Sequence, residues 1–514
     1  MSLDQVTLKT LDSVIGLWWL PENENNKIHG VLELKESRLR LRTTQMFEGL
    51  QTIEREMIPA VQGFIATGLK ITLLDCKKPK QIINMPGMIE VIFEFSTIIV
   101  GKNYSSDRIQ VKSLRCRFNG LEKWLGDMPV DAYKYKCKDD QEYEFYAHAR
   151  EPEKYSCSID DFTAVIESKI ILSVNEHVEA GFKRTASVSF CFPDSVNVFD
   201  AIKQACKYRD FLTLCMGNHN HILSIQAVDE EEDNIAVLYN DEIKSLDLPT
   251  NPAYNCLISF SDIKDSYQDC VQTWYQKYEE IRPIIAYFVD ACQKKNNIDL
   301  PMEFLKMVQA LESYSRRMRK TTLIPPEEHQ ERISRIVNHF DEKDDDREWI
   351  ADVLKTPILN EPSCSKRITA LFKETAEELG ISKSKAASLA YKIVATRNYY
   401  THFNESLLPG ILSEHDIFYS IALMKNVLKV VLCRELSVEL PDMKEKLGNN
   451  SELALALGEL GLTPPLKPCS VTIADKAKPD EMENSNGGTE PETNHRPPEC
   501  GIYRGDPETG FLVR

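Results

Sequence analysis

The sequence of 514 residues contains no uninterrupted apolar stretch of the length that a membrane span needs. A transmembrane helix requires roughly 18 to 20 such residues, and the longest candidate, at residues 284–289, is far shorter. The first residues also lack the basic and then apolar layout of a secretory signal. We therefore expect a cytoplasmic protein that has no membrane partner.

The 14 cysteines form no Cys-x-x-Cys pair, and most lie in apolar runs, where a free thiol behaves as a small buried hydrophobic group. This pattern excludes a disulfide framework. The nearest approach to a zinc motif is Cys215, His219 and His221, with Cys206 upstream, but the spacing matches no strong zinc pattern. A short connection between a helix and a strand explains it as well, so we expect no metal and no cofactor.

Several enzyme signatures are also missing. The sequence has no Gly-x-x-x-x-Gly-Lys-Ser/Thr loop, no Gly-x-Gly-x-x-Gly after a strand, no His-Glu-x-x-His and no Gly-x-Ser-x-Gly. Nucleotide-binding, zinc-protease and serine-hydrolase functions are therefore disfavoured.

Basic residues are outnumbered, 62 against 79 acidic ones, which gives a formal net charge of −17. The long-range field of such a chain repels nucleic acid. Any contact with RNA must then come from local basic patches.

The composition is that of a globular protein, with 42% hydrophobic and 27% charged residues. Up to about residue 260, apolar residues alternate with polar ones, as in Leu32-x-Leu34 and Ile89-x-Val91, which predicts strands. The glycines that we interpret as turns of an antiparallel sandwich or barrel are Gly30, Gly63, Gly68, Gly87 and Gly101. One helix is expected from Val198 to about Leu212, after Asp194 and Ser195.

From residue 266 the apolar spacing becomes helical, and after Thr463 the chain is rich in Pro, Glu, Asn and Gly. We predict an α+β multidomain protein with three parts. They are a β-rich, sandwich- or barrel-like region at residues 1–265, an all-α helical bundle at 266–463 and a disordered tail at 464–514.

The segment of most interest is Arg397-Asn-Tyr-Tyr-Thr-His402, at the end of an expected helix. An arginine and a histidine with four to six residues between them occur by chance about once in such a chain, and Arg332 with His339 is a second match. The setting separates the two, because residues 381–404 contain no acidic residue, whereas His339 has acidic neighbours. The same helix carries Lys383, Lys385 and Lys392.

The residue types suit RNA cleavage. A histidine can take the proton of a ribose 2′-hydroxyl or return one to the leaving oxygen, and an arginine can stabilise the charge on the phosphate. Asn398 and His402, four residues apart, share a helix face, so the amide could orient the imidazole. Arg397 and His402 lie about 140° apart on an ideal helix. Their convergence is easier across the two-fold axis of a homodimer.

This arrangement of Arg397, Asn398 and His402 resembles the HEPN ribonuclease fold, together with the upstream helix that includes Phe304 and Glu312 and the long closing helix at residues 417–432. The first half resembles the leader of ApeA-like bacterial anti-phage proteins. That likeness rests on Gly16-Leu-Trp-Trp-Leu-Pro21, Gly30-Val-Leu-Glu-Leu34, Leu73-Leu-Asp-Cys76 and Phe118-Asn-Gly-Leu-Glu-Lys-Trp-Leu125.

The resemblance implies a metal-independent endoribonuclease that acts as a homodimer, with Arg397 and His402 in catalysis and Asn398 in a supporting polar role. It also implies abortive infection, in which a phage-derived trigger acts on the N-terminal region and host or phage RNA is cut. Transfer RNA is a common target among HEPN enzymes.

Other residues allow a functional and a structural interpretation. Arg316, Arg317, Arg319 and Lys320 could guide RNA phosphates, but a charge run at a helix end is commonly solvated. Glu312 could brace the active site or simply be satisfied in the core. Trp18 and Trp19 could stack on a base or divide between core and rim.

Two further functions stay open. One is a non-catalytic helical adaptor that binds RNA or a protein partner, which the acidic charge favours. The other is a ligand- or glycan-binding β-sandwich that uses the helices only for dimerisation.

Overall fold

The computed structural model describes residues 3, 6–35, 38–47, 57–77, 80–83, 87, 89–126, 129–138, 142–175, 179–239, 256–293, 299–341, 345–403, 405–436 and 442–463. The expected disordered tail at 464–514 lies outside the described residues. Residues 1–463 form one compact unit. The domain boundary between residues 265 and 266 therefore stays a prediction.

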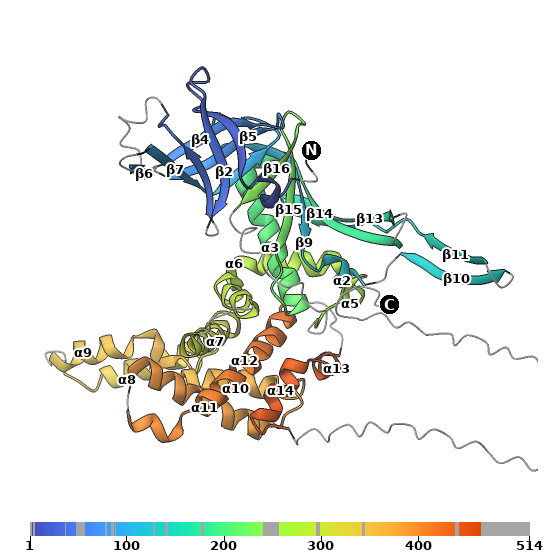
Figure 1. Ribbon diagram of the computed structural model, residues 1–514. Coiled ribbons are helices and arrows are strands. Elements are labelled where there is room, and N and C mark those ends of the chain that lie inside the picture. Colours follow the sequence, from blue (N-terminus) through green and yellow to red (C-terminus); the bar gives the residue numbers. More distant parts are fainter. Residues whose placement is uncertain are drawn as a thin grey trace, which may run out of the picture. The chain divides into compact units, whose positions relative to one another are not determined.

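The first half of the chain is an antiparallel β region, as predicted (Figure 1). After the short helix α1 (Leu8–Leu11), the strands of its first part are β1 (Val14–Trp19), β2 (Ile28–Lys35), β3 (Arg38–Thr43), β4 (Met57–Ile65), β5 (Lys70–Lys77), β6 (Lys80–Ile83), β7 (Ile89–Phe95) and β8 (Thr97–Val100). They are followed by β9 (Gln110–Phe118), β12 (Tyr155–Ile159), β13 (Phe162–Asn175), β14 (Glu179–Asn197), β15 (Ile222–Asp229) and β16 (Asn234–Tyr239). A separate hairpin pairs β10 (Val130–Lys138) with β11 (Glu142–Ala149).

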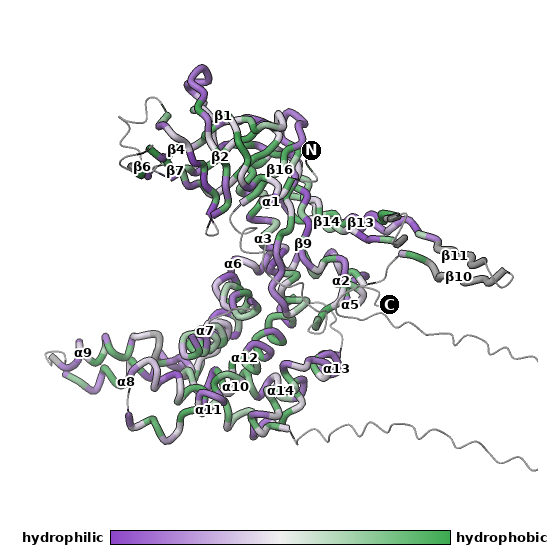
Figure 2. The backbone as a smooth tube through the Cα atoms, viewed as in Figure 1, coloured by the Kyte–Doolittle hydropathy of each residue, from purple (hydrophilic) through white to green (hydrophobic). Residues whose placement is uncertain are grey.

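The fourteen strands form one sheet in the order β12-β13-β14-β9-β15-β16-β8-β5-β4-β1-β2-β3-β7-β6. Hydrophobic and hydrophilic residues alternate along several of these strands (Figure 2), such as β2 and β7, because they bury one face more than the other. On the edge strand β12, a side chain forms hydrogen bonds with the free backbone groups of one residue. Gln268 accepts a hydrogen bond from Ser158 N–H and donates one to Ser158 C=O, both at 2.7 Å, which occupies backbone groups that would otherwise attract another strand.

Two of the glycines predicted as turns have a different role. Gly30 lies inside β2 and Gly63 inside β4, both against the buried ring of Trp18. A Cβ atom at Gly63 would lie 2.3 Å from Cε3 of Trp18, so these positions are glycine because the indole needs the space. Gly68 and Gly101, in contrast, have positive φ angles of 82° and 119° and do form turns.

Helix α3 (Val198–Met216) packs against β9 and β14 of the sheet. Its N-cap is Asn197, whose side chain accepts from Phe199 N–H at 2.9 Å. The start signals expected at Asp194 and Ser195 were therefore placed too early, because these residues still belong to β14.

The second half is helical, as predicted, and it follows the short helices α2 (Leu121–Leu125) and α5 (Phe260–Ile263). Its α-helices are α6 (Tyr267–Cys292), α7 (Leu300–Tyr314), α8 (Pro326–Val337), α9 (Asp345–Leu354), α10 (Cys364–Glu374), α11 (Lys383–His402), α12 (Glu414–Arg434), α13 (Met443–Gly448) and α14 (Ser451–Glu459). The π-helical turn η5 (Ser315–Arg319) and the 3₁₀ turns η6 (Pro357–Asn360) and η7 (Glu405–Gly410) connect them.

The hydrophobic core is continuous from β9, β14 and α3 into α6, α7, α11 and α12, while β1 to β8 enclose a second core around Trp18. Helix α7 contacts α6, α10, α11 and α12. This central position of α7 brings Glu312 close to α11, the helix that carries the Arg397-to-His402 segment.

Candidate active site

Helix α11 holds all three candidate catalytic residues on one continuous helix. The Ser382 hydroxyl caps its start by accepting from Lys385 N–H at 3.3 Å. At its end Phe403 adopts a left-handed φ of 50°, and its N–H donates to the carbonyl of Tyr399. Because His402 is the last helical residue, its direction is fixed by the helix on one side and the turn on the other.

Arg397 and His402 leave α11 on different sides. Arg397 continues the line of the buried residues Ala386, Ala390 and Ile393, at helical spacings of four, three and four, and so faces the bundle. His402 projects about 140° away around the helix and is exposed. Among the described residues no hydrogen bond or ion pair joins the two side chains. The structure of the single chain therefore does not bring the two side chains into contact.

Arg397 is held by two neighbours. Its Nη2 lies 3.8 Å from Oε2 of Glu312 on α7, and its Nη1 donates to Oδ1 of Asn398 at 3.1 Å. Glu312 is only 7% exposed and also accepts from Nε of Arg316 at 3.2 Å. Glu312 is therefore both a buried, paired carboxylate and a neighbour of Arg397 within ion-pair distance, and its role as a brace of the active site stays a prediction.

Asn398 has a different partner from the one expected. Its carbonyl oxygen accepts from Arg397, although Asn398 and His402 do share a helix face. The Asn398 amide thus bonds to the guanidinium of the preceding residue. No hydrogen bond from Asn398 to His402 occurs in the described part of the chain, so Asn398 supports Arg397 here.

The lysines of α11 do not form a single basic stripe. Lys385 and Lys392 lie on the same side, about 20° apart, and Lys383 lies opposite them. The ammonium group of Lys385 donates to the carbonyls of Gly461 and Leu462 at 3.1 and 2.9 Å, which anchors the end of α14. Lys383 and Lys392 are exposed, so they are the better placed of the three for an RNA backbone.

The basic cluster after α7 is already paired within the chain. Arg316 lies 2.9 Å from Glu361, Arg319 lies 2.7 Å from Glu374 and Lys320 lies 3.3 Å from Glu280. Arg317 donates to the Glu280 carbonyl at 3.2 Å. An RNA phosphate would have to compete with these contacts, and RNA binding by this cluster stays a prediction.

Arg367 on α10 was missed by the sequence analysis. It is 3% exposed and donates from Nε to the carbonyl of Pro362 and from Nη2 to Glu361, both at 2.9 Å, while its Nη1 has no hydrogen-bond partner among the described residues. Glu361 also binds Arg316, and Arg316 binds Glu312, the partner of Arg397. Positively and negatively charged side chains therefore alternate along a row from Arg397 to Arg367. The signal in the sequence was an arginine on the apolar face of α10 beside Ile368 and Leu371.

Cys364, the first residue of α10, lies next to this network. Burial raises the pKa of its thiol to about 11, and the charge of Glu312 adds to the effect. The thiol is therefore protonated at neutral pH and is a poor nucleophile.

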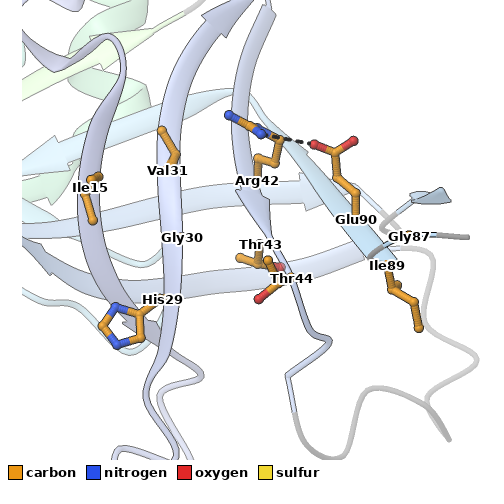
Figure 3. Close-up of a pocket in the computed structure, with 10 residues that line it drawn as sticks. All are labelled: Ile15, His29, Gly30, Val31, Arg42, Thr43, Thr44, Gly87, Ile89 and Glu90. Carbon is orange, nitrogen blue, oxygen red and sulfur yellow. Dashed lines mark ion pairs between the residues drawn. The ribbon is translucent and has the colours of Figure 1, made fainter. Parts of the chain in front are cut away.

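The β region carries a second candidate site, a cavity of about 480 Å³ on the exposed face of β1, β2, β3 and β7 (Figure 3). Apolar side chains of Ile15, Val31 and Ile89 line it together with an ion pair of 3.3 Å between Arg42 and Glu90. This mixture suits an amphipathic small ligand, which is the property that the β-sandwich alternative requires.

Trp18 and Trp19 do not offer a stacking surface, because both are buried, at 0% and 3% exposure. Their indole N–H groups donate to the Gly30 carbonyl and to Gln62. Both side chains pack inside the β region.

His219 and His221 lie side by side, but no group of three or more His, Cys, Asp or Glu with metal-binding geometry occurs in the described ranges. Within the same ranges, none of the helices combines the length and the apolar character that crossing a membrane requires.

Comparisons with known proteins agree with both halves of this architecture. Residues 13–274, about half of the chain, match the family model of ApeA N-terminal domain 1, and residues 305–442 match the model of the Apea-like HEPN domain. No match was found among the curated proteins or among the solved structures. The second model contains α11, α12 and most of α7, and therefore the Arg397-to-His402 segment and Glu312. The chain thus belongs to the ApeA family, with an ApeA N-terminal domain followed by an Apea-like HEPN domain.

Proposed function

We propose that this protein is a metal-independent endoribonuclease of anti-phage defence that cuts host or phage RNA through a site shared by two protomers. The observation that carries the proposal is the position of Arg397 and His402 on the last turns of α11, inside the segment that matches the HEPN model. HEPN domains are generally ribonucleases. Transfer RNA is one candidate substrate, and a phage-derived trigger is expected to act on the β region.

In the proposed reaction His402 takes the proton from a ribose 2′-hydroxyl, and the resulting alkoxide attacks the adjacent phosphate. The bond between the phosphorus and the 5′-oxygen of the next nucleotide breaks. That oxygen is the leaving group, and it takes up a proton from a protonated histidine. Arg397 binds the phosphate oxygens and stabilises the added charge in the transition state. Glu312 and Asn398 hold the guanidinium in place, which reduces the cost of ordering it during the reaction.

The dimer is supported by the outward face of α11. Tyr391, Ala395, Asn398 and His402 follow one another at spacings of four, three and four, so they form one stripe opposite the buried side. Tyr391 is 67% exposed. A second copy of α11 packed along this stripe would place His402 of each protomer in the shared interface.

The test is RNA cleavage by the purified protein in the presence of EDTA. His402→Ala should lower cleavage by about a thousandfold, within the range of lost general acid–base catalysis, while the fold and oligomeric state persist. His339→Ala is the matched control, because His339 belongs to the second Arg/His match but lies after α8. Normal cleavage by His402→Ala would rule out the assignment.

A non-catalytic adaptor remains the second candidate, favoured by the net charge of −17 and by the internal pairing of the 316–320 cluster. It predicts stoichiometric binding of RNA or a protein without turnover. Binding that is unchanged in His402→Gln, together with no RNA cleavage by the wild type, would favour it.

A further inference from the structure

A cavity separate from the one in Figure 3, polar and about 300 Å³ in volume, lies where the segment between α3 and β15 meets the C-terminal end of α6. Its polar lining includes Arg209, His219, His221, Tyr239, Asp290 and Gln293. None of these residues belongs to the Arg397–His402 site, and the proposed ribonuclease reaction does not use them. Cavities of this size are at the small end of ligand-binding sites.

The hydrogen-bonding groups of this cavity are held in place by one another. Nδ1 of His219 lies 3.0 Å from Nε2 of His221, and Nε2 of His219 lies 3.2 Å from the side-chain amide of Gln293. Asp290 accepts from Lys306 on α7 at 2.9 Å. A small molecule would therefore meet an imidazole pair, an amide and a carboxylate in fixed positions, which lowers the ordering cost of binding.

The charged groups around the cavity are arranged in pairs, which disfavours an anion as the main ligand. Burial, together with the nearby charges of His221 and Arg209, lowers the pKa of His219 to about 3, so this imidazole is neutral. The guanidinium of Arg209 is paired with Asp210 at 2.8 Å, and the second oxygen of Asp210 accepts from Tyr278. Asp290 is paired in the same way with Lys306 at 2.9 Å, so these four charged groups of the cavity form two ion pairs, which favours an uncharged ligand over a phosphate.

The remaining walls are apolar. Ile222, Ala286 and Val289 line the cavity, and the two imidazole rings, with centroids 4.2 Å apart and planes tilted by 48°, present aromatic surface. Aliphatic and aromatic walls combined with an amide and a carboxylate fit a flat heterocycle that stacks through its faces and forms hydrogen bonds at its edge.

We propose that this cavity binds an uncharged nucleobase or nucleoside. The amide of Gln293 can pair with a donor–acceptor edge of the base, and Asp290 can accept from an exocyclic amino group, as such side chains do in nucleic-acid recognition. Because α3 and β15 form one wall and α6 the other, the bound molecule bridges the β region and the first long helix of the second half. Asp290 also accepts a hydrogen bond from Lys306 on α7, so the bound molecule would be connected to that helix as well.

The test is isothermal titration calorimetry on the full chain with each of the four ribonucleosides, and with inorganic phosphate and zinc chloride as separate probes. At least one nucleoside should bind at submillimolar concentration. Gln293→Ala and Ala286→Trp should weaken this binding by about tenfold or more, since the first removes the edge contact and the second fills the cavity. Gln276→Ala is the matched control, because Gln276 is an exposed glutamine of the same helix outside the cavity.

Three results would overturn the proposal. They are no heat of binding with any nucleoside at millimolar concentration, nucleoside binding that both cavity variants retain, and binding of only phosphate or zinc that is lost in the same variants. Circular dichroism checks that each variant is folded. If Ala286→Trp does not fold, Gln293→Ala alone decides, because its side chain lies beyond the last turn of α6.

Discussion

At the scale of single residues, the pairing of Arg397 with Glu312 bears most directly on the proposed reaction. A surface ion pair contributes little to stability, but Glu312 is buried and anchored by Arg316 as well. Its effect is to fix the direction of the guanidinium. An arginine that is free to rotate would bind phosphate without stabilising the transition state equally well.

Replacing Glu312 by glutamine should therefore lower kcat for RNA cleavage by about tenfold or more and change KM much less. Glutamine keeps the size of the side chain and removes its charge. The measurement is a steady-state cleavage assay with a defined RNA, together with a thermal melt of the same sample.

Glu374→Gln is the control for this experiment. Glu374 lies 2.7 Å from Arg319 and 2.9 Å from Arg434, and in the described residues it has no ion pair with Arg397 or Arg316. It should lower the melting temperature and leave kcat near the wild-type value. Equal losses of kcat in both variants would mean that Glu312 acts only through general stability.

At the scale of elements, Glu435, the residue after α12, joins several helices. Its carboxylate accepts from Tyr314 on α7 at 2.7 Å, lies 3.1 Å from Lys277 on α6 and 3.2 Å from Arg319 on η5. Burial by itself would raise the pKa of this carboxyl group, but hydrogen bonds from Tyr314 and Lys277 outweigh it, and the pKa is lowered overall.

A carboxyl group whose pKa is lowered by folding stabilises the protein above its unfolded pKa, about 4.3 for glutamate. This stabilisation is lost as the pH falls through the lower pKa of the folded state. The free energy of unfolding should therefore decrease below about pH 4.3, as urea melts at a series of pH values can measure. Glu435→Gln should flatten that part of the curve, and an unchanged slope would contradict the role of Glu435.

At the scale of the whole molecule, the central feature is that Arg397 faces its own bundle while His402 faces outward on the α11 stripe. An acidic chain with a net charge of −17 also needs a local surface free of carboxylates to approach RNA. The acid-free segment at residues 381–404 provides this on α11. Two such helices packed together would concentrate that surface in one cleft.

Mixing two inactive variants tests the shared site. In a heterodimer of Arg397→Ala with His402→Ala, one of the two sites has both native residues if each site takes its arginine and its histidine from different protomers. After subunit exchange, an equal mixture should then recover about a quarter of wild-type activity. Either variant alone stays inactive. A mixture without activity, in which mass spectrometry detects the heterodimer, would place both residues of a site in one protomer.

Local patterns in the sequence predicted the general distribution of strands and helices, although not every boundary. Alternation of apolar and polar residues predicted the strands, and the change to helical spacing near residue 266 agrees with the start of α6 at Tyr267. The helix expected to end near His402 agrees with α11, which spans Lys383–His402. These features depend on neighbours within a few residues, so the printed sequence contains them.

Local sequence patterns did not predict how side chains from different elements contact one another. Gly30 and Gly63 had the appearance of turn residues until the sheet placed Trp18 against them, and the role of Asn398 depended on where Arg397 points. Arg367 was overlooked because its burial, at 3% exposure, depends on the packing of α10 against α7 and α11.

The sequence by itself determined which residues of α11 are suited to RNA chemistry and that they lie on one helix. Only the tertiary structure decided that Arg397 faces inward to Glu312 while His402 faces outward. The physical reason is that helix geometry fixes the angle between two side chains, whereas the packing of α7 against α11 fixes which of them faces the core.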